Sequence, residues 1–178
     1  MRRRHCPGFT LVELLVALMV VAILASIAIP SYSAYVIRGQ RAAAKAGLEQ
    51  AAQWLERNYT TSGCYNFTDA LSCGAQGGNA VAASWPFTGA PTDGGAITYA
   101  IPVPTVWTAP APATPGQYFL LTATPCGAGG AACPAGSNTG FSDPQCGQLL
   151  LDSTGQKGIN VTGTNDFTSA AVTNCWQR

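Results

Sequence analysis

Hydrophobic residues are concentrated in one stretch near the start of the chain. From Leu11 to Ile29 the sequence has nineteen residues, and only Glu13 among them is charged. A helix that crosses the hydrocarbon core of a bilayer needs about 20 mostly apolar residues, within a range of about 17–25. The pattern therefore predicts a helix that can span a membrane and that carries a single carboxylate close to its beginning.

An amphipathic helix pattern follows over residues 31–60. Its apolar side chains recur on one face of a 3.6-residue repeat, and they are Ile37, Ala44, Leu48, Ala51, Ala52, Leu55 and Tyr59. Gly63 is expected to end the helix. From Phe9 to Tyr59 such a rod would be about 75 Å long, which exceeds what a domain of this size needs. Its first half must therefore be buried by something other than the domain itself.

The remaining residues, 61–178, combine turn signals with short β-type runs. Residues 64–96 are expected to be loop-like because glycine and proline punctuate them. The strand candidates are Ile97–Val103, Tyr118–Thr124, Gln148–Asp152 and Gly158–Thr162, and a hairpin signal at residues 153–156 joins the last two. The expected fold class is α+β. A long N-terminal α-helix, its hydrophobic half protruding, packs on a roughly four-stranded antiparallel β-sheet.

Charged side chains are few and unevenly placed. They make up 10% of the chain, against about 25% in typical globular domains. Arg2, Arg3 and Arg4 precede the apolar stretch, and the positive-inside tendency keeps that end in the cytoplasm. The net charge of +1 becomes −2 if the first eight residues are removed. The shortened chain would have no general attraction to phosphate backbones.

The small residue Gly8 stands before the apolar stretch instead of after it. A secretory signal peptide is cut after its apolar region, whereas a cut after Gly8 would leave the hydrophobic segment on the mature protein. An ordinary single-pass anchor explains the apolar run and the arginines but not Glu13. A carboxylate at the bilayer centre costs about 2.5–3.5 kcal/mol. Cleavage before Phe9 would create an α-amino group that can neutralise Glu13 of a neighbouring subunit.

The segment GFTLVELLVALMVVAILASIAIPSY resembles the class III leader and N-terminal helix of type IV pilins and their pseudopilin relatives. This resemblance implies cleavage between Gly8 and Phe9 by prepilin peptidase and N-methylation of Phe9 by the same enzyme. It implies Glu13 as the assembly glutamate and Pro30 as a helix-kinking proline. The chain would then comprise a leader (1–8), a transmembrane and filament-core helix half (9–30), an amphipathic helix half (31–60) and an extracytoplasmic head (61–178).

A narrower resemblance links the runs YVIRGQRAAAKAGLEQAAQWLERNYTTSGCY and CGQLLLDSTGQKG…NCW to minor pilins. It implies a structural subunit of a type IV pilus that supports pilus biogenesis, twitching motility and adhesion. The implied partners are other pilin subunits, prepilin peptidase, the inner-membrane assembly platform and, before assembly, membrane lipid. The implied location is the bacterial inner membrane and then the extracellular pilus.

The charged residues of the first run are expected on a solvated face or in subunit–subunit pairs, where exposed ion pairs contribute about 0–1 kcal/mol each. They are Arg38, Arg41, Lys45, Glu49, Glu56 and Arg57. Residues 56–60 also fit an acidic-x-Asn-x-Thr glycosylation acceptor at Asn58, which we interpret as a chance match.

Seven cysteines are present, and Cys6 belongs to the leader. The other six are Cys64, Cys73, Cys126, Cys133, Cys146 and Cys175. An even number in a translocated region predicts disulfides, and wide spacings with the sole histidine in the leader argue against zinc. Cys64 and Cys73 can close a short loop, and Cys126 and Cys133 flank a Gly/Ala-rich loop. The minor-pilin resemblance pairs Cys146 with Cys175. Six cysteines permit fifteen connectivities, so these pairs are hypotheses.

No catalytic motif, cofactor or metal site is expected, because the mature chain has no histidine and no GxSxG, Walker or HExxH pattern. Two alternatives to a purely structural subunit remain. The first is a DNA-uptake receptor pilin or adhesin, in which aromatic residues such as Trp85, Trp107 and Trp176 stack on bases. Against it, the basic residues in or near the head are only Arg57, Lys157 and Arg178. The second is a type II secretion pseudopilin, whose common major form relies on a calcium site in place of cysteines.

Overall fold

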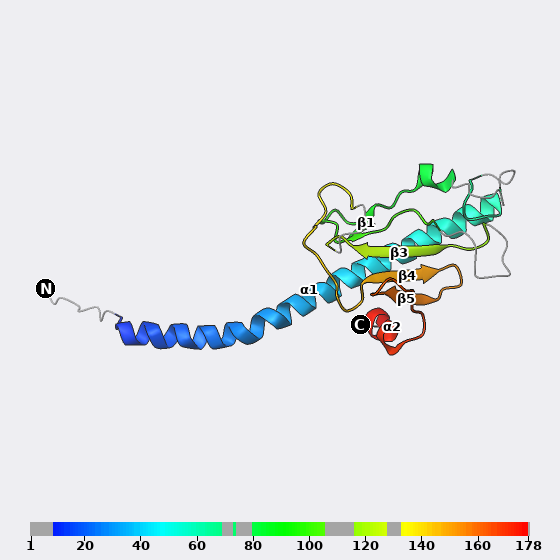
Figure 1. Ribbon diagram of the computed structural model, residues 1–178. Coiled ribbons are helices and arrows are strands. Elements are labelled where there is room, and N and C mark those ends of the chain that lie inside the picture. The colour runs from blue at the N-terminus through cyan, green and yellow to red at the C-terminus, as the bar shows by residue number, and fades with distance from the viewer. Residues whose placement is uncertain (1–8, 69–72, 74–79, 106–115, 128–132, 178) are drawn as a thin grey trace. The chain divides into compact units, whose positions relative to one another are not determined.

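We describe a computed structural model of the chain, which covers residues 9–68, 73, 80–105, 116–127 and 133–177 (Figure 1). The chain divides into two compact units, Met1–Ile37 and Arg38–Arg178. The long helix α1 spans Leu11–Ser62 and therefore contributes residues to both units. Its end agrees with the stop expected at Gly63, whose backbone has a positive φ of 79° and donates its N–H to the carbonyl of Tyr59.

In the first unit the apolar side chains of α1 are exposed. Leu11 is 79% accessible and Ile27 is 69% accessible. By length and composition, α1 contains a stretch that could cross a membrane. A continuous exposed surface of large apolar side chains indicates that this part of α1 is buried by an apolar environment outside the chain.

In the second unit a five-stranded antiparallel sheet packs with residues 38–62 of α1 (Figure 1). The strands are β1 (Gly89–Ala90), β2 (Tyr99–Ala100), β3 (Leu120–Pro125), β4 (Gln148–Asp152) and β5 (Lys157–Asn160). They follow one another in space in chain order, with Leu121 opposite Leu151 and Leu149 opposite Ile159. A 3₁₀ helix, η1 (Ala80–Ser84), precedes β1, and a short helix, α2 (Ala170–Gln177), follows β5.

The core lies between the helix and the sheet. Its helical side consists of Ala44, Leu48, Ala51 and Leu55, all fully buried, at the spacing predicted for the amphipathic stretch. Gly47 allows close approach, since a Cβ there would lie 2.6 Å from Cδ1 of Ile101. The α+β class and the antiparallel sheet are therefore confirmed.

Three details differ from the sequence prediction. The expected strand at Ile97–Val103 is reduced to Tyr99–Ala100, followed by Pro102, which has no N–H to donate. The region 64–96, expected to be loop, contains η1 and the edge strand β1. Gly89 and Ala90 have no alternation of large side chains, so nothing in their pattern indicated a strand. Helix α2 was also not predicted; Asp166 precedes it and accepts the N–H groups of Thr168 and Ser169.

Candidate functional site

The start of α1 carries the candidate assembly residue. Thr10 precedes the helix, and its Oγ1 accepts the backbone N–H of Glu13 at 3.3 Å. The Thr10 hydroxyl lies 3.5 Å from Oε2 of Glu13, so threonine and glutamate occupy the positions of a capping box. A carboxylate in the first turn also interacts favourably with the helix dipole. Glu13 is thus accommodated at the helix start without burial against other parts of the described chain.

The remaining processing residues are described only in part. Phe9 is 77% accessible, and Gly8 lies outside the described residues. Pro30 lies within the bounds of α1. The cleavage, the methylation and the kink stay predictions.

Arg41 forms a buried ion pair with Asp143 in the second unit. Its Nε and Nη2 atoms donate to the two carboxylate oxygens of Asp143 at 2.5 and 2.6 Å. Tyr99 donates its hydroxyl to the same carboxylate at 2.7 Å, and the backbone N–H of Cys146 donates to it at 3.1 Å. Arg41 also donates to the side-chain carbonyl of Gln145. The prediction of a solvated or intersubunit role is therefore wrong for Arg41, which is 5% exposed.

The electrostatics of this network favour the charged forms of its ion pair. Burial alone would raise the pKa of Asp143, but hydrogen bonds from Arg41, Tyr99 and Cys146 lower the pKa below its ordinary value. The bond to Asp143 raises the pKa of Arg41. Burial, with the hydrogen bond to Asp143, raises the pKa of Tyr99. Arg41 and Asp143 therefore remain charged and Tyr99 remains a neutral donor across the physiological range.

Lys45 lies one helical turn after Arg41 and reaches the C-terminal helix. Its Nζ donates to the carbonyl of Trp176 at 3.0 Å, which places a cation at the carbonyl end of α2. Burial lowers the pKa of Lys45, and the charges of Arg41 and Lys157 lower it further. Lys157 lies 3.8 Å from Glu49 and 5.2 Å from the ring centre of Trp176, so it covers the indole face.

Trp176 does not present the exposed ring that base stacking requires. It is 8% exposed, and its Nε1 donates to the carbonyl of Gly158 at 2.9 Å. Trp85 is half-buried and donates to the carbonyl of Ile101, while Trp107 lies outside the described residues. The expectation of an exposed Trp176 is therefore wrong.

A different aromatic group lies beside the sheet edge. Trp54 of α1 meets Trp85 edge to face at 5.6 Å, and Trp85 meets Phe87 at 5.1 Å. Next to Phe87 is a cavity of about 320 Å³ lined by Gln50, Thr88 and Thr92 together with glycine and proline residues of the β1–β2 region. The cavity lining carries no charged side chain. It is an uncharged surface, without the cations that phosphate binding needs.

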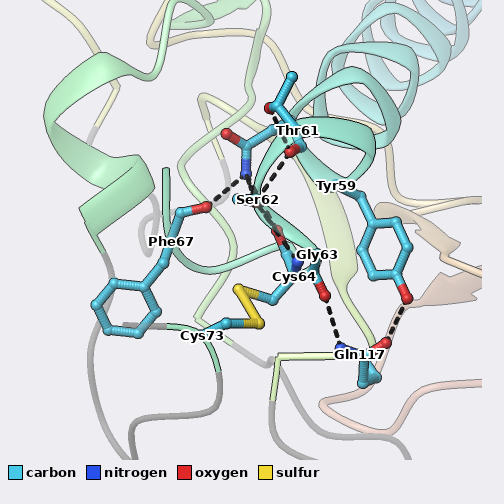
Figure 2. Close-up of a disulfide and its surroundings, with 9 residues drawn as sticks. Tyr59, Thr61, Ser62, Gly63, Cys64, Phe67, Cys73 and Gln117 are labelled. Carbon is cyan, nitrogen blue, oxygen red and sulfur yellow. Dashed lines mark hydrogen bonds between the residues drawn. A yellow bond between two sulfur atoms is a disulfide. The ribbon is translucent and has the colours of Figure 1, made fainter. Parts of the chain in front are cut away.

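Three disulfides occur in the second unit. They join Cys64 to Cys73, Cys126 to Cys133 and Cys146 to Cys175. Figure 2 shows the first beside the end of α1, where Gln117 accepts the Tyr59 hydroxyl at 2.5 Å and donates to the carbonyl of Gly63 at 2.9 Å. These bonds tie the helix end to the segment that leads into β3.

Asn58 organises the same corner. Its Nδ2 donates to the carbonyls of Cys64 and Phe67 at 3.2 and 2.8 Å. An N-linked glycan would replace one of the two hydrogens on this same nitrogen, so that at most one of the two bonds could remain. The geometry therefore disfavours Asn58 as a glycosylation site, in line with the interpretation of its motif as a chance match.

Among the residues that the structure describes, the acidic side chains do not form a metal centre. Within the described ranges, no group of three or more His, Cys, Asp or Glu side chains is placed to hold a metal ion. Asp152 is engaged in its own turn, where it accepts the N–H groups of Thr154 and Gln156.

Three features define a type IV pilin. They are an exposed apolar helix start, an antiparallel sheet packed with the later part of that helix, and a disulfide-closed C-terminal loop. Two family comparisons give the same class. Residues 3–29 match the prokaryotic N-terminal methylation motif. Residues 30–149, more than half of the chain, match the type IV minor pilin ComP, DNA uptake sequence receptor, and the chain belongs to this family. A search of curated proteins found no match.

Proposed function

We propose that this chain is a minor pilin made as a membrane-anchored precursor and then built into a type IV pilus. The exposed apolar run of α1 directly after the matched methylation motif carries the proposal. Prepilin peptidase would cut between Gly8 and Phe9 and methylate the new α-amino group. Residues 9–30 would lie in the inner membrane first and against neighbouring pilin helices afterwards. Both environments bury the side chains that the chain leaves exposed.

Glu13 would set the position of the subunit in the filament. Its carboxylate is held near the helix start by Thr10, so it is presented at a defined place when the helix enters an apolar surrounding. There, an unpaired carboxylate is costly, and the α-amino group of a neighbouring Phe9 offers the compensating charge. The assembly platform of the inner membrane would bring the two together.

The second unit would be the extracytoplasmic head. Its three disulfides require an oxidising compartment, which agrees with the topology set by Arg2, Arg3 and Arg4. A role in twitching motility or adhesion would follow from incorporation into the pilus. The match to a type IV minor pilin supports this assignment over a type II secretion pseudopilin.

Reception of DNA is a second candidate function, and the family match supports it. The family is described as a DNA uptake sequence receptor, and the match extends over most of the head as far as residue 149. The charge distribution limits how such a head would bind. In the described part of the second unit the cations are Arg38, Arg41, Lys45, Arg57 and Lys157. Arg41 is paired with Asp143 and Lys45 donates to the carbonyl of Trp176, which leaves three.

A salt titration tests the DNA function quantitatively. Each phosphate contact on a duplex contributes about 0.9 to the slope of log K against log salt. Three cations, with Arg178 outside the described residues as a fourth, predict a slope no steeper than about −3.6. The mature chain in detergent would be titrated with labelled duplex DNA. Binding that falls with this slope supports reception; no binding at low salt contradicts it.

A deletion strain separates the two functions. Loss of DNA uptake with normal pilus number supports the receptor. Loss of pili or motility without a specific uptake defect supports a role in biogenesis. Mass spectrometry of sheared filaments from the complemented strain must recover the chain beginning at Phe9. Absence of that peptide from purified pili would overturn the assignment as a pilus subunit.

A further inference from the structure

Two cations of α1, one helical turn apart, contact residues that flank the same disulfide-closed loop on its two sides. Arg41 binds the carboxylate of Asp143, whose Oδ1 accepts the backbone N–H of Cys146 at 3.1 Å. Lys45 donates to the carbonyl of Trp176 at 3.0 Å, and Trp176 directly follows Cys175. Cys146 and Cys175 form the disulfide that closes this loop. Each half of the disulfide is therefore connected to α1 through one cation.

The Arg41 connection is buried and directional, and the Lys45 connection is partly buried. Arg41 is 5% exposed and Asp143 is 3% exposed, and both cysteines are almost fully buried. Arg41 binds the carboxylate through two parallel donors, an arrangement that fixes orientation as well as distance. Trp176 is held a second time, because its Nε1 donates to the carbonyl of Gly158 in β5. The backbone near each cysteine is thus held by contacts that do not involve the S–S bond.

We propose that Arg41 and Lys45 are positioning residues for the Cys146–Cys175 disulfide, so that docking of the C-terminal loop on α1 and closure of the disulfide are coupled. The proposal does not depend on whether the head binds DNA. Holding both cysteine backbones against one helix raises the effective concentration of one thiol near the other. By thermodynamic linkage, the free energy by which these contacts favour the disulfide equals the free energy by which the disulfide favours the Arg41–Asp143 and Lys45–Trp176 contacts.

Closure proceeds by thiol–disulfide exchange with a disulfide oxidant, for which oxidised glutathione serves as the probe. One cysteine thiolate attacks the glutathione disulfide, forms a mixed disulfide and releases one reduced glutathione. The second cysteine thiolate attacks the mixed disulfide and releases another. The two thiols lose two protons and two electrons, and one oxidised glutathione becomes two reduced molecules. Arg41 and Lys45 take no part in these bond changes and act only through the positions of the cysteines.

The test uses the mature full chain in detergent, equilibrated with mixtures of reduced and oxidised glutathione. Free thiols are trapped by alkylation, and peptide mass spectrometry under non-reducing conditions gives the fraction of each disulfide. The midpoint is the ratio of oxidised glutathione to the square of reduced glutathione at which half of Cys146–Cys175 has formed. We expect this ratio to be about tenfold higher in Arg41→Ala, because loss of a buried ion-pair partner is strongly destabilising. In Lys45→Ala the same ratio should be about threefold higher, since this change removes a single charge-assisted hydrogen bond.

Two controls separate positioning from general stability. Arg38→Ala removes an exposed cation one turn before Arg41 and should leave the midpoint unchanged. In every variant, Cys64–Cys73 serves as an internal reference, because it lies at the other end of the packed part of α1. An unchanged Cys146–Cys175 midpoint in the Arg41 and Lys45 variants would overturn the proposal. An equal shift of Cys64–Cys73 would overturn it as well.

Arg41→Lys keeps the test valid if Arg41→Ala does not fold. Lysine retains the charge but loses the two-donor geometry, so we expect a midpoint shift in the same direction, smaller than that for alanine. A midpoint equal to that of the natural protein in both Arg41→Lys and Lys45→Ala contradicts the proposal. A shift confined to Cys146–Cys175 supports it.

Discussion

The two units of this chain differ in whether the apolar side chains of α1 are buried within the chain. In the first unit, Leu11 and Ile27 are more than two-thirds exposed, while in the second Leu48 and Leu55 on the same helix are fully buried. The difference follows from what each stretch has available to pack against. The second stretch has a sheet in its own chain, whereas the first needs lipid or other subunits. Charged residues differ likewise, since Glu13 is exposed at the start of the helix, whereas Arg41 is paired within the chain.

The largest expected effect comes from Glu13→Ala. Without the carboxylate the α-amino group of a neighbouring Phe9 has no partner in an apolar surrounding, so incorporation into pili should be abolished or nearly so. The head should unfold at the same denaturant concentration as the natural protein. Immunogold labelling and mass spectrometry of sheared pili measure incorporation. Glu49→Ala, a change at an exposed glutamate of the second unit, is the matched control, and normal incorporation of Glu13→Ala would refute the assembly role.

Arg41→Ala should produce the opposite pattern, with its effect inside the head. Removing one partner of a buried ion pair leaves Asp143 charged and uncompensated, and we expect a loss of about 3–5 kcal/mol in unfolding free energy. Arg38→Ala should change it by less than about 0.5 kcal/mol, as is usual for surface sites. Urea unfolding of the mature chain in detergent measures both. Equal effects of the two changes would show that Arg41 contributes no more than a surface charge.

Acid should weaken the same ion pair. Because the pKa of Asp143 is lowered in the folded state, its stabilisation is complete at neutral pH. It is lost as the pH falls below the ordinary value of 3.8 toward the lowered one. The difference in unfolding free energy between the natural protein and Asp143→Asn should therefore become smaller over this pH range. The decrease should be less than the loss of unfolding free energy caused by Arg41→Ala. The pKa of Asp166 is also lowered, by its hydrogen bonds with Ser169 and Thr168. Because Asp166 is present in both proteins, its contribution to the pH dependence cancels in the difference.

A constant difference between Asp143→Asn and the natural protein from pH 7 down to about pH 2 would contradict this account. It would mean that the carboxylate charge contributes nothing and that only the shape of the side chain matters.

Two helical glycines provide the smallest and most closely matched comparison. At Gly39 nothing lies within 4 Å of the position that a Cβ would occupy, whereas at Gly47 a Cβ would lie 2.6 Å from Ile101. Gly39→Ala should stabilise the helix by about 0.5–1 kcal/mol. Gly47→Ala should stabilise less or destabilise, and Gly47→Val should cost about 1–3 kcal/mol through overpacking. Thermal unfolding measures the differences, and equal gains at both glycines would show that the helix and sheet are not in close contact at Gly47.

The sequence alone was sufficient to predict the pilin family, the α+β class and the buried face of the amphipathic helix. These features depend on interactions between residues close in sequence. A run of apolar residues, a 3.6-residue repeat and a capping glycine can each be read over a few helical turns. The position of Glu13 within the apolar run is a local feature of the same kind.

Only the tertiary structure decided the roles of Arg41 and Trp176. Arg41 stands in a run of charged and small residues that reads as a solvated face, and its partner Asp143 lies 102 positions further on. Trp176 reads as an exposed aromatic residue near the chain end until the carbonyl of Gly158 and the side chain of Lys157 are placed around it. Strand β1 likewise exists because Tyr99 and Ala100 lie beside Gly89 and Ala90. Such contacts join residues that are not neighbours in sequence, and the local pattern does not indicate which partner folding will supply.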